Sequence, residues 1–239
     1  MAPRTVPARH GTVRRKAYAV ALHAVVQYMH MLTALVVVVV LAVLVFAEYL
    51  SRFKGVHSEL TRKFVHILVG MFVAFWPFFL GWGQIQFLSI AFLAVVGLSV
   101  KFHIFRSIHA VERNTMGEVL FALVIGILAL IVTNKWVFAA AMLHLSLADG
   151  LAAIVGLGWG DHNKYKILGH SKSIAGSLTF FFASVLIMVW YAYFSHTPAD
   201  ATIIIGLPVV ATIVENVAIR GTDNLAIPLL VGLALTSSL

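Results

Sequence analysis

The sequence predicts an all-α fold, a polytopic bundle of about seven or eight transmembrane helices. Three observations predict it. Of the 239 residues, 61% are hydrophobic and only 11% are charged, whereas a soluble protein carries about 25% charged residues. The mean hydropathy is +0.98. The apolar residues also occur in runs close to the roughly 20 residues that a helix needs to cross the hydrocarbon core of a bilayer.

Polar loops separate the apolar runs, which lie near residues 31–50, 64–80, 84–100, 117–134, 136–158, 173–195, 201–219 and 224–239. The last run is short and contains Pro228, so we expect it to be tilted, kinked or only partly inserted. Segment 17–30 is too short to cross alone and is expected either to lie at the interface or to extend the first span. The predicted units are a basic tail, 1–30, and one membrane-embedded domain, 31–239.

The net charge of +8 comes largely from the short loops, where membrane topology places basic residues, and we therefore exclude nucleic acid as a partner. The loops after the first, third, fifth and seventh spans contain Arg52, Lys54, Arg62, Lys63, Lys101, Arg106, Arg113, Lys164, Lys166, Lys172 and Arg220. The alternate connections contain only Lys135. The positive-inside rule places the basic loops in the cytoplasm. The chain has no cysteine, which excludes disulfides and thiol chemistry.

The same rule places the N-terminus outside, in conflict with its own basic residues, Arg4, Arg9, Arg14, Arg15 and Lys16. A missed crossing or a re-entrant segment within 17–50 would remove the conflict.

Every unusual polar cluster lies at or near the basic loops. The first is TRKFVHILVG, 61–70, in which Arg62, His66 and Gly70 share one helix face. Arg62 and Lys63 suit a polyphosphate, and His66, one turn deeper, could hold an oxygen or move a proton. Alternatively, the basic residues are interfacial anchors and His66 forms a hydrogen bond within the bundle.

The second cluster is VERNTMGEVLFAL, 111–123. Thr115 and Glu118 fit a capping box that opens the fourth span. Glu118 also begins a membrane helix, where a carboxylate is costly unless it is paired or bound to a metal.

The third cluster begins at LADGLAAIVGLGWG, 147–160. Its small residues, Ala148, Ala152, Gly156 and Gly160, recur every four positions and indicate close helix packing, within one chain or in a homo-oligomer. Asp149 lies beside this stripe. It is either the buried partner of a basic residue or, as is usual for a carboxylate at membrane depth, a functional group.

The same cluster ends at GHSKSIAG, 169–176, at the mouth of the sixth span. Ser173 and Gly176 allow backbone N–H groups to approach an anion at a helix N-terminus, and Lys172 adds a positive charge. Lys164 and Lys166 precede it in the same basic loop. The stretch is not a Walker A motif, and by itself it indicates phosphate binding only weakly.

The fourth cluster is VENVAIRGTDNLAIPLL, 214–230, with Glu215 inside an apolar span. Asp223 either caps the last helix or, together with Asn224, binds a divalent metal or a hydroxyl group. Taken together, the carboxylates of Glu118, Asp149, Glu215 and Asp223 and the basic clusters predict a pocket for Mg²⁺ or Mn²⁺ and a nucleoside triphosphate. A pocket embedded in a membrane suggests a lipid acceptor.

In this order, the blocks RKFVH, GE, ADGLAAIVG followed by KSIAGS, and VEN followed by TDNLAIP resemble the CTP-dependent polyprenol kinase family. That family includes dolichol kinase, phytol kinase and the yeast-type CTP-dependent diacylglycerol kinase, and the ending is most similar to the phytol kinase branch. The resemblance covers about residues 60–230. Phytol and dolichol kinases usually have Gly-Asp-Gly where this chain has Ala148-Asp149-Gly150, a difference that leaves the carboxylate in place.

The resemblance implies an integral membrane kinase that transfers the γ-phosphoryl group of CTP, or of another nucleotide, to a lipid alcohol. It implies that Asp149 is the leading catalytic or Mg²⁺-binding carboxylate; His66, which could move a proton, is a second catalytic candidate. The implied nucleotide-binding residues are Arg62, Lys63, Lys164, Lys166, Lys172, Ser173 and Gly176, and the implied metal ligands are Asp149, Glu118, Glu215, Asp223 and Asn224. The nucleotide arrives from the cytoplasm and the alcohol from the bilayer.

Three alternatives remain open at the level of sequence. A cytidylyltransferase acting on a lipid phosphate, or a kinase extending a monophosphate, would use the same groups. A transporter would use the buried carboxylates as a proton or ion relay. Clustering of the polar residues on one side, rather than across the bilayer, disfavours the transporter.

Overall fold

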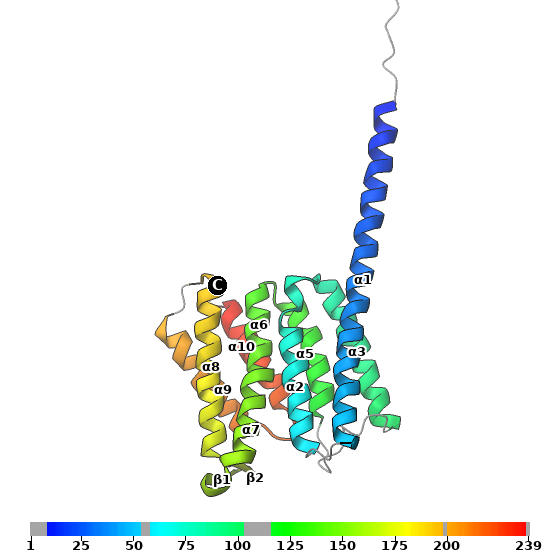
Figure 1. Cartoon of the computed structure of the whole chain (residues 1–239). Helices are drawn as coiled ribbons and strands as arrows, with labels where there is room; N and C mark the ends of the chain where they lie inside the picture. Colours follow the sequence, from blue (N-terminus) through cyan, green and yellow to red (C-terminus); the bar gives the residue numbers. More distant parts are fainter. Residues whose placement is uncertain (1–8, 54–57, 103–115, 198–199, 238–239) are drawn as a thin grey trace, which may run out of the picture. The chain divides into compact units, whose positions relative to one another are not determined.

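The computed structural model describes residues 9–53, 58–102, 116–197 and 200–237, and most of them are helical (Figure 1). This confirms the all-α class. In the described residues, five helices are long and apolar enough to cross a membrane, and three shorter apolar helices accompany them. The chain divides into two units, 1–39 and 40–239.

The first helix, α1 (Arg9–Phe53), has 45 residues without a break and contains the apolar stretch Tyr18–Phe46. At about 1.5 Å per residue it is far longer than the roughly 30 Å hydrocarbon core requires. Segment 17–30 therefore extends the first span, one of the two expectations. A missed crossing or re-entrant segment within 17–50 is wrong, because this part of the chain is one continuous helix.

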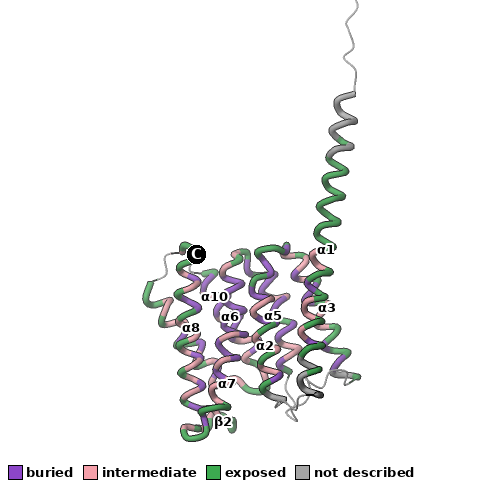
Figure 2. The backbone as a smooth tube through the Cα atoms, in the orientation of Figure 1, coloured by how far each residue is buried: buried purple, intermediate pink, exposed green. Residues whose placement is uncertain are grey.

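The second unit is a helical bundle. Its helices are α2 (Ser58–Ala74), α3 (Trp82–Phe102), α5 (Gly117–Ile131), α6 (Lys135–Leu143), α7 (Asp149–Trp159), α8 (Ile174–Ser195), α9 (Leu207–Val217) and α10 (Asp223–Ser237). Two π-helical turns, η2 (His144–Ala148) and η4 (Thr202–Gly206), lead into α7 and α9. The helix that runs through α6, η2 and α7 is the most deeply buried of the five long ones, and α6 forms the core (Figure 2).

The lysine-rich loop after α7 forms a β-hairpin, which the sequence analysis did not predict. Strand β1 (Lys164–Ile167) pairs antiparallel with β2 (His170–Ser173). Leu168 and Gly169 connect them with φ angles of 48° and 81°. Positive φ at both central residues is the geometry of a tight hairpin turn whose twist matches the strands.

The four polar clusters meet at one end of the bundle, as the sequence predicts. The starts of α2, α5, α8 and α10, the ends of α7 and α9, and the hairpin all lie at this end (Figure 1). The opposite ends of the helices carry aromatic residues that pack together, among them Trp136, Trp190 and Phe194. The molecule therefore separates a polar end from an apolar body.

Candidate active site

The centre of the polar end is the ion pair between Lys63 on α2 and Asp149 at the start of α7. The Lys63 Nζ donates to Asp149 Oδ2 at 2.8 Å, and Asp149 is only 4% exposed. The Nε2 of His66 lies 3.6 Å from the same oxygen. Asp149 is thus the buried partner of a basic residue, as one sequence interpretation predicted, and a buried charge without such a partner would be strongly destabilising.

A close approach of two helices brings these groups together. A Cβ atom built on Gly150 would lie 2.2 Å from Cγ1 of Ile67, which is one turn beyond Lys63 on α2. Only a residue without a side chain fits there. Gly70, farther along α2, is similarly packed against Ser146 of η2. The glycine after Asp149 therefore serves packing, which places α2 within reach of the carboxylate.

The π-helical turn before Asp149 supplies a further contact. His66 donates from Nε2 to the backbone carbonyl of Leu145, 2.9 Å away, and its ring meets Phe121 edge-on. Single π-helical turns free backbone groups from the regular helix ladder and are frequent at functional sites. His66 is therefore hydrogen-bonded within the bundle, as one interpretation predicted, and also lies next to Asp149.

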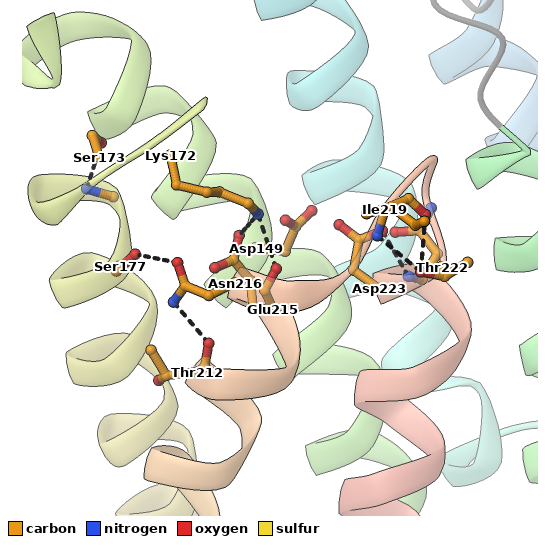
Figure 3. Close-up of polar contacts among 12 residues, drawn as sticks. Asp149, Lys172, Ser173, Ser177, Thr212, Glu215, Asn216, Ile219, Thr222 and Asp223 are labelled. Atoms are coloured by element: carbon orange, nitrogen blue, oxygen red, sulfur yellow. Dashed lines mark hydrogen bonds and ion pairs between the residues drawn. The ribbon is translucent and has the colours of Figure 1, made fainter. Parts of the chain in front are cut away.

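A second ion pair joins Lys172 on β2 to Glu215 on α9. The Lys172 Nζ contacts Glu215 Oε1 and also donates to the backbone carbonyl oxygen of Glu215 at 2.9 Å. Glu215 is 6% exposed, and its other oxygen, Oε2, is buried without a hydrogen-bond partner. Asp149 lies beside this pair (Figure 3) and interacts electrostatically with both of its members.

The GE block brings a third pair to the same end. A Cβ on Gly221, whose φ is +86°, would lie 2.7 Å from the backbone of Gly117, so the turn before α10 abuts the start of α5. Asn224 fastens this contact by donating from Nδ2 to the Gly117 carbonyl at 2.7 Å. Arg62 then lies 3.6 Å from Glu118.

The structure describes only part of the predicted helix caps. The N-cap of α5 is Met116, without a side-chain cap bond, and Thr115 lies outside the described residues, so the capping box of Thr115 and Glu118 stays a prediction. Asp223 is the first residue of α10, and its carboxylate accepts from the N–H of Asn224. Asp223 is close enough to Asp149 and the two lysines to interact with them electrostatically.

Capping and packing account for Ser173 and Gly176. Ser173 caps α8 by accepting from the Gly176 N–H at 3.1 Å, so this N–H already has a partner. A Cβ on Gly176 would lie 3.0 Å from the carbonyl oxygen of Ala152 and 3.6 Å from the Cα of Gly156. The predicted small-residue stripe is therefore confirmed as close packing, of α7 on α8 within one chain.

Lys164 and Lys166 do not join the two ion pairs. Both are exposed on β1, and strand alternation turns them to the face opposite Tyr165 and its register partner Lys172. Lys164 donates to Asp161 at 2.6 Å, and this hydrogen bond lowers the pKa of the exposed Asp161 carboxyl.

Comparison with known proteins identifies the family. The chain is 36% identical over 196 residues to a phytol kinase of Synechocystis sp., a match that covers 79% of this chain and 83% of the relative. The chain belongs to the phytol kinase family.

Two plant proteins of the phytol kinase family also match. Identity is 29% over 215 residues to a probable phytol kinase 2, chloroplastic, of Oryza sativa subsp. japonica, covering 80% of this chain and 70% of the relative. The chain is also 28% identical over 208 residues to phytol kinase 1, chloroplastic, of Arabidopsis thaliana, a match that covers 76% of this chain and 67% of the relative. No family model and no solved structure matches the chain.

The sequence analysis missed two polar residues of this phytol kinase family member, Tyr165 and Ser177. The Tyr165 hydroxyl donates to Asn216 Oδ1 and lies 2.6 Å from Ser177 Oγ, which donates to the same oxygen at 2.9 Å. Ser177 is one helical turn beyond Ser173, a spacing that could have drawn attention to it. Nothing in the sequence marked Tyr165, because the hairpin that orients it was not predicted.

A divalent cation fits this end of the molecule without a dedicated cage. In the part of the chain that the structure describes, no three His, Asp or Glu side chains converge on one point. Three described ion pairs lie at this end, Arg62–Glu118, Lys63–Asp149 and Lys172–Glu215, and a fourth carboxylate, Asp223, is close enough to Asp149 to interact with it electrostatically. The unpartnered Oε2 of Glu215 is a free hard-oxygen ligand. Mg²⁺ is usually held by one or two carboxylates plus substrate phosphates.

Proposed function

We propose that this chain is an integral membrane kinase that transfers the γ-phosphoryl group of CTP to the hydroxyl of an isoprenoid alcohol such as phytol, geranylgeraniol or a polyprenol. The observation that carries the proposal is the pair of buried lysine–carboxylate contacts, Lys63–Asp149 and Lys172–Glu215, at one end of a membrane bundle. The relatives named phytol kinase support the isoprenoid acceptor. CTP as the donor rests on the family resemblance.

The two lysines are suited to exchange partners. Each now neutralises a carboxylate, and each can instead bind a phosphate of the nucleotide, since Lys is a common phosphate ligand. Arg62, at the same end, is a third candidate for the phosphates. The exchange leaves Asp149 and Glu215 available for Mg²⁺ or Mn²⁺, whose chemistry here is to neutralise charge on the β- and γ-phosphates.

The transfer itself forms one bond and breaks one. The alcohol oxygen attacks the γ-phosphorus, the bond between that phosphorus and the bridging oxygen breaks, and CDP leaves with the bond electrons. The hydroxyl proton passes to Asp149 or, if Asp149 serves as a metal ligand, to a transferred phosphoryl oxygen. A loose transition state needs little base strength, so both roles are compatible with the chemistry.

The orientation in the membrane follows from charge. The lysine-rich hairpin and the start of α2 lie at the same end as the two ion pairs (Figure 1), and the positive-inside rule places basic loops in the cytoplasm, where CTP is available. We propose that the site faces the cytoplasm and takes its second substrate from the bilayer.

Product analysis with the purified chain in lipid nanodiscs tests this function. Nucleotides labelled at the α- or γ-phosphate are combined in turn with phytol, geranylgeraniol, a polyprenol and diacylglycerol. We expect CDP and a γ-labelled lipid monophosphate from CTP and an isoprenoid alcohol. Release of pyrophosphate with an α-labelled lipid would instead identify a cytidylyltransferase. Proton-coupled flux without nucleotide would identify a transporter.

A further inference from the structure

An apolar groove of about 390 Å³ lies between α8 and α9. Ile174, Leu178 and Phe181 line it from α8, and Val209 and Ile213 line it from α9. These residues recur every three or four positions, so each wall is one face of a helix. The volume falls within the range of about 300–1,000 Å³ that is usual for small-molecule sites.

The groove is accessible from the side of the bundle. Leu178 and Ile213 are 50% and 57% exposed, although both are large and apolar. In a bundle that spans the membrane, such side chains face lipid rather than water. A hydrocarbon chain can therefore enter the groove directly from the bilayer.

Tyr165 and Ser177 add two hydroxyl groups to the lining of the groove. Their hydroxyls and Asn216 Oδ1 form three mutual contacts. The two hydroxyl protons are donated within the network, to which the Asn216 amide nitrogen contributes only through its bond to the Thr212 carbonyl. Because hydroxyl and amide oxygens each have two lone pairs, lone pairs remain in the network to accept from an additional O–H donor.

This hydroxyl network adjoins the Lys172–Glu215 ion pair. Asn216 directly follows Glu215 in α9, and Tyr165 is the register partner of Lys172 across the hairpin. In Figure 3, Ser177 and Asn216 lie on the α8 side of Glu215 and hydrogen-bond to each other. A molecule lying in the groove therefore points its polar end toward the carboxylates.

On the basis of the function proposed above, we propose that this groove binds the isoprenoid chain of the acceptor alcohol and that Tyr165 and Ser177 position its hydroxyl end. A lining that is apolar apart from a few hydroxyls matches such a molecule, with one hydroxyl at the end of a long apolar chain. While it is bound, the alcohol donates a hydrogen bond to the network, and the lone pairs of its oxygen stay available to the phosphorus; the proton leaves to the acceptor named above only when the new bond forms. Tyr165 and Ser177 are positioning residues, because the chemistry rests on the carboxylates.

Photolabelling of the full chain in phosphatidylcholine nanodiscs tests the groove without nucleotide. The probe is an isoprenoid alcohol with a photoreactive diazirine on its chain. We expect cross-links on 174–181 and 209–213 that excess phytol displaces. Leu178→Trp should reduce this labelling, whereas Leu186→Trp, the same change two turns along α8 at a residue that is 69% exposed outside the groove, should not.

Kinetics supply a second readout. Leu178→Trp should raise the KM for phytol by about tenfold, since small changes in an apolar pocket alter selectivity by about 10–200-fold. A five-carbon alcohol and the nucleotide should keep their KM values. Ser177→Ala and Tyr165→Phe should raise the KM for alcohols of every length and leave the KM of the nucleotide unchanged.

The outcomes separate the groove from the kinase activity. Cross-links that phytol does not displace, or equal losses in Leu178→Trp and Leu186→Trp, would mean that only bilayer lipid occupies the groove and would overturn the assignment. A protein that phosphorylates no alcohol but shows displaceable labelling of the groove would refute the proposed function and retain the binding site.

Discussion

The two buried ion pairs look alike in composition and differ in construction. Lys63–Asp149 joins two helices of the bundle, and His66 lies beside the same carboxylate oxygen. Lys172–Glu215 joins a strand of the hairpin to α9, and one Glu215 oxygen has no partner. Their side chains are similarly buried, at 6% and 7% exposed for the two acids.

The difference indicates a division of roles. Asp149 is held in place by packed helices and by Gly150, which preorganises the carboxylate before substrate arrives. Glu215 keeps a free oxygen and is paired with a lysine on a short two-stranded hairpin, an element that is only marginally stable by itself. We expect the first pair to set the geometry of the reaction and the second to admit the nucleotide.

Neutralising the two acids should have the largest effect and should separate the pairs. Asp149→Asn should lower kcat by about 10²–10³-fold, the range for losing one preorganised electrostatic group. Glu215→Gln should cause a smaller loss, because the amide keeps one oxygen that can still contribute. The assay is phosphorylation of phytol at saturating CTP, with Asp161→Asn as an exposed control. Near-normal activity in Asp149→Asn would contradict the assignment.

Removing the cations should affect folding more at the first pair than at the second. Lys63→Met leaves Asp149 buried without its cation and should lower the free energy of unfolding by about 3–5 kcal/mol. Lys172→Met should lower the free energy of unfolding less, since the Lys172 side chain is 21% exposed and that of Lys63 is only 12% exposed. Denaturant unfolding in detergent measures both. In the double variant Lys63→Met/Asp149→Asn, stability should recover and activity should not.

The packing at Gly150 offers a way to displace the first pair without touching its charges. Gly150→Ala should lower stability by about 1–3 kcal/mol, the usual range for overpacking, and reduce activity. The matched control is Gly158→Ala on the same helix, where an added Cβ would meet no atom within 4 Å. Shortening Ile67 to Ala should partly restore Gly150→Ala. If both glycine variants behave alike, helix proximity does not hold Asp149 in place.

Substitutions on the exposed face of the hairpin should have the smallest effect on activity. Lys166→Ala should raise the KM for CTP a few-fold at low salt and leave kcat unchanged, because an exposed charge attracts a nucleotide but does not enter the site. The effect should fade at high salt as the charge is screened. Lys135→Ala, at the opposite end of the bundle, is the control. A kcat loss in Lys166→Ala would mean that the outer face of β1 contacts the reacting phosphates.

Much of this organisation could be predicted from the sequence. Apolar runs of membrane-spanning length predicted the helices. The position of Asp149 inside such a run marked it as the leading acid, because a carboxylate within a membrane is energetically costly and is usually functional. The position of every polar cluster at or near a basic loop also predicted that they meet at one end. The hairpin was missed, since its strands are only four residues each and their lysines suggested a solvated loop.

The sequence by itself determined the class of the protein, the membrane helices and the acidic and basic residues that gather at one end, because hydropathy and charge are properties of single residues. Only the tertiary structure decided which lysine pairs with which acid, that Gly150 and Gly176 are packing positions, and that Tyr165, Ser177 and Asn216 converge. These facts depend on the spacing between helices and on the register of a hairpin, which arise from contacts between residues far apart in the chain.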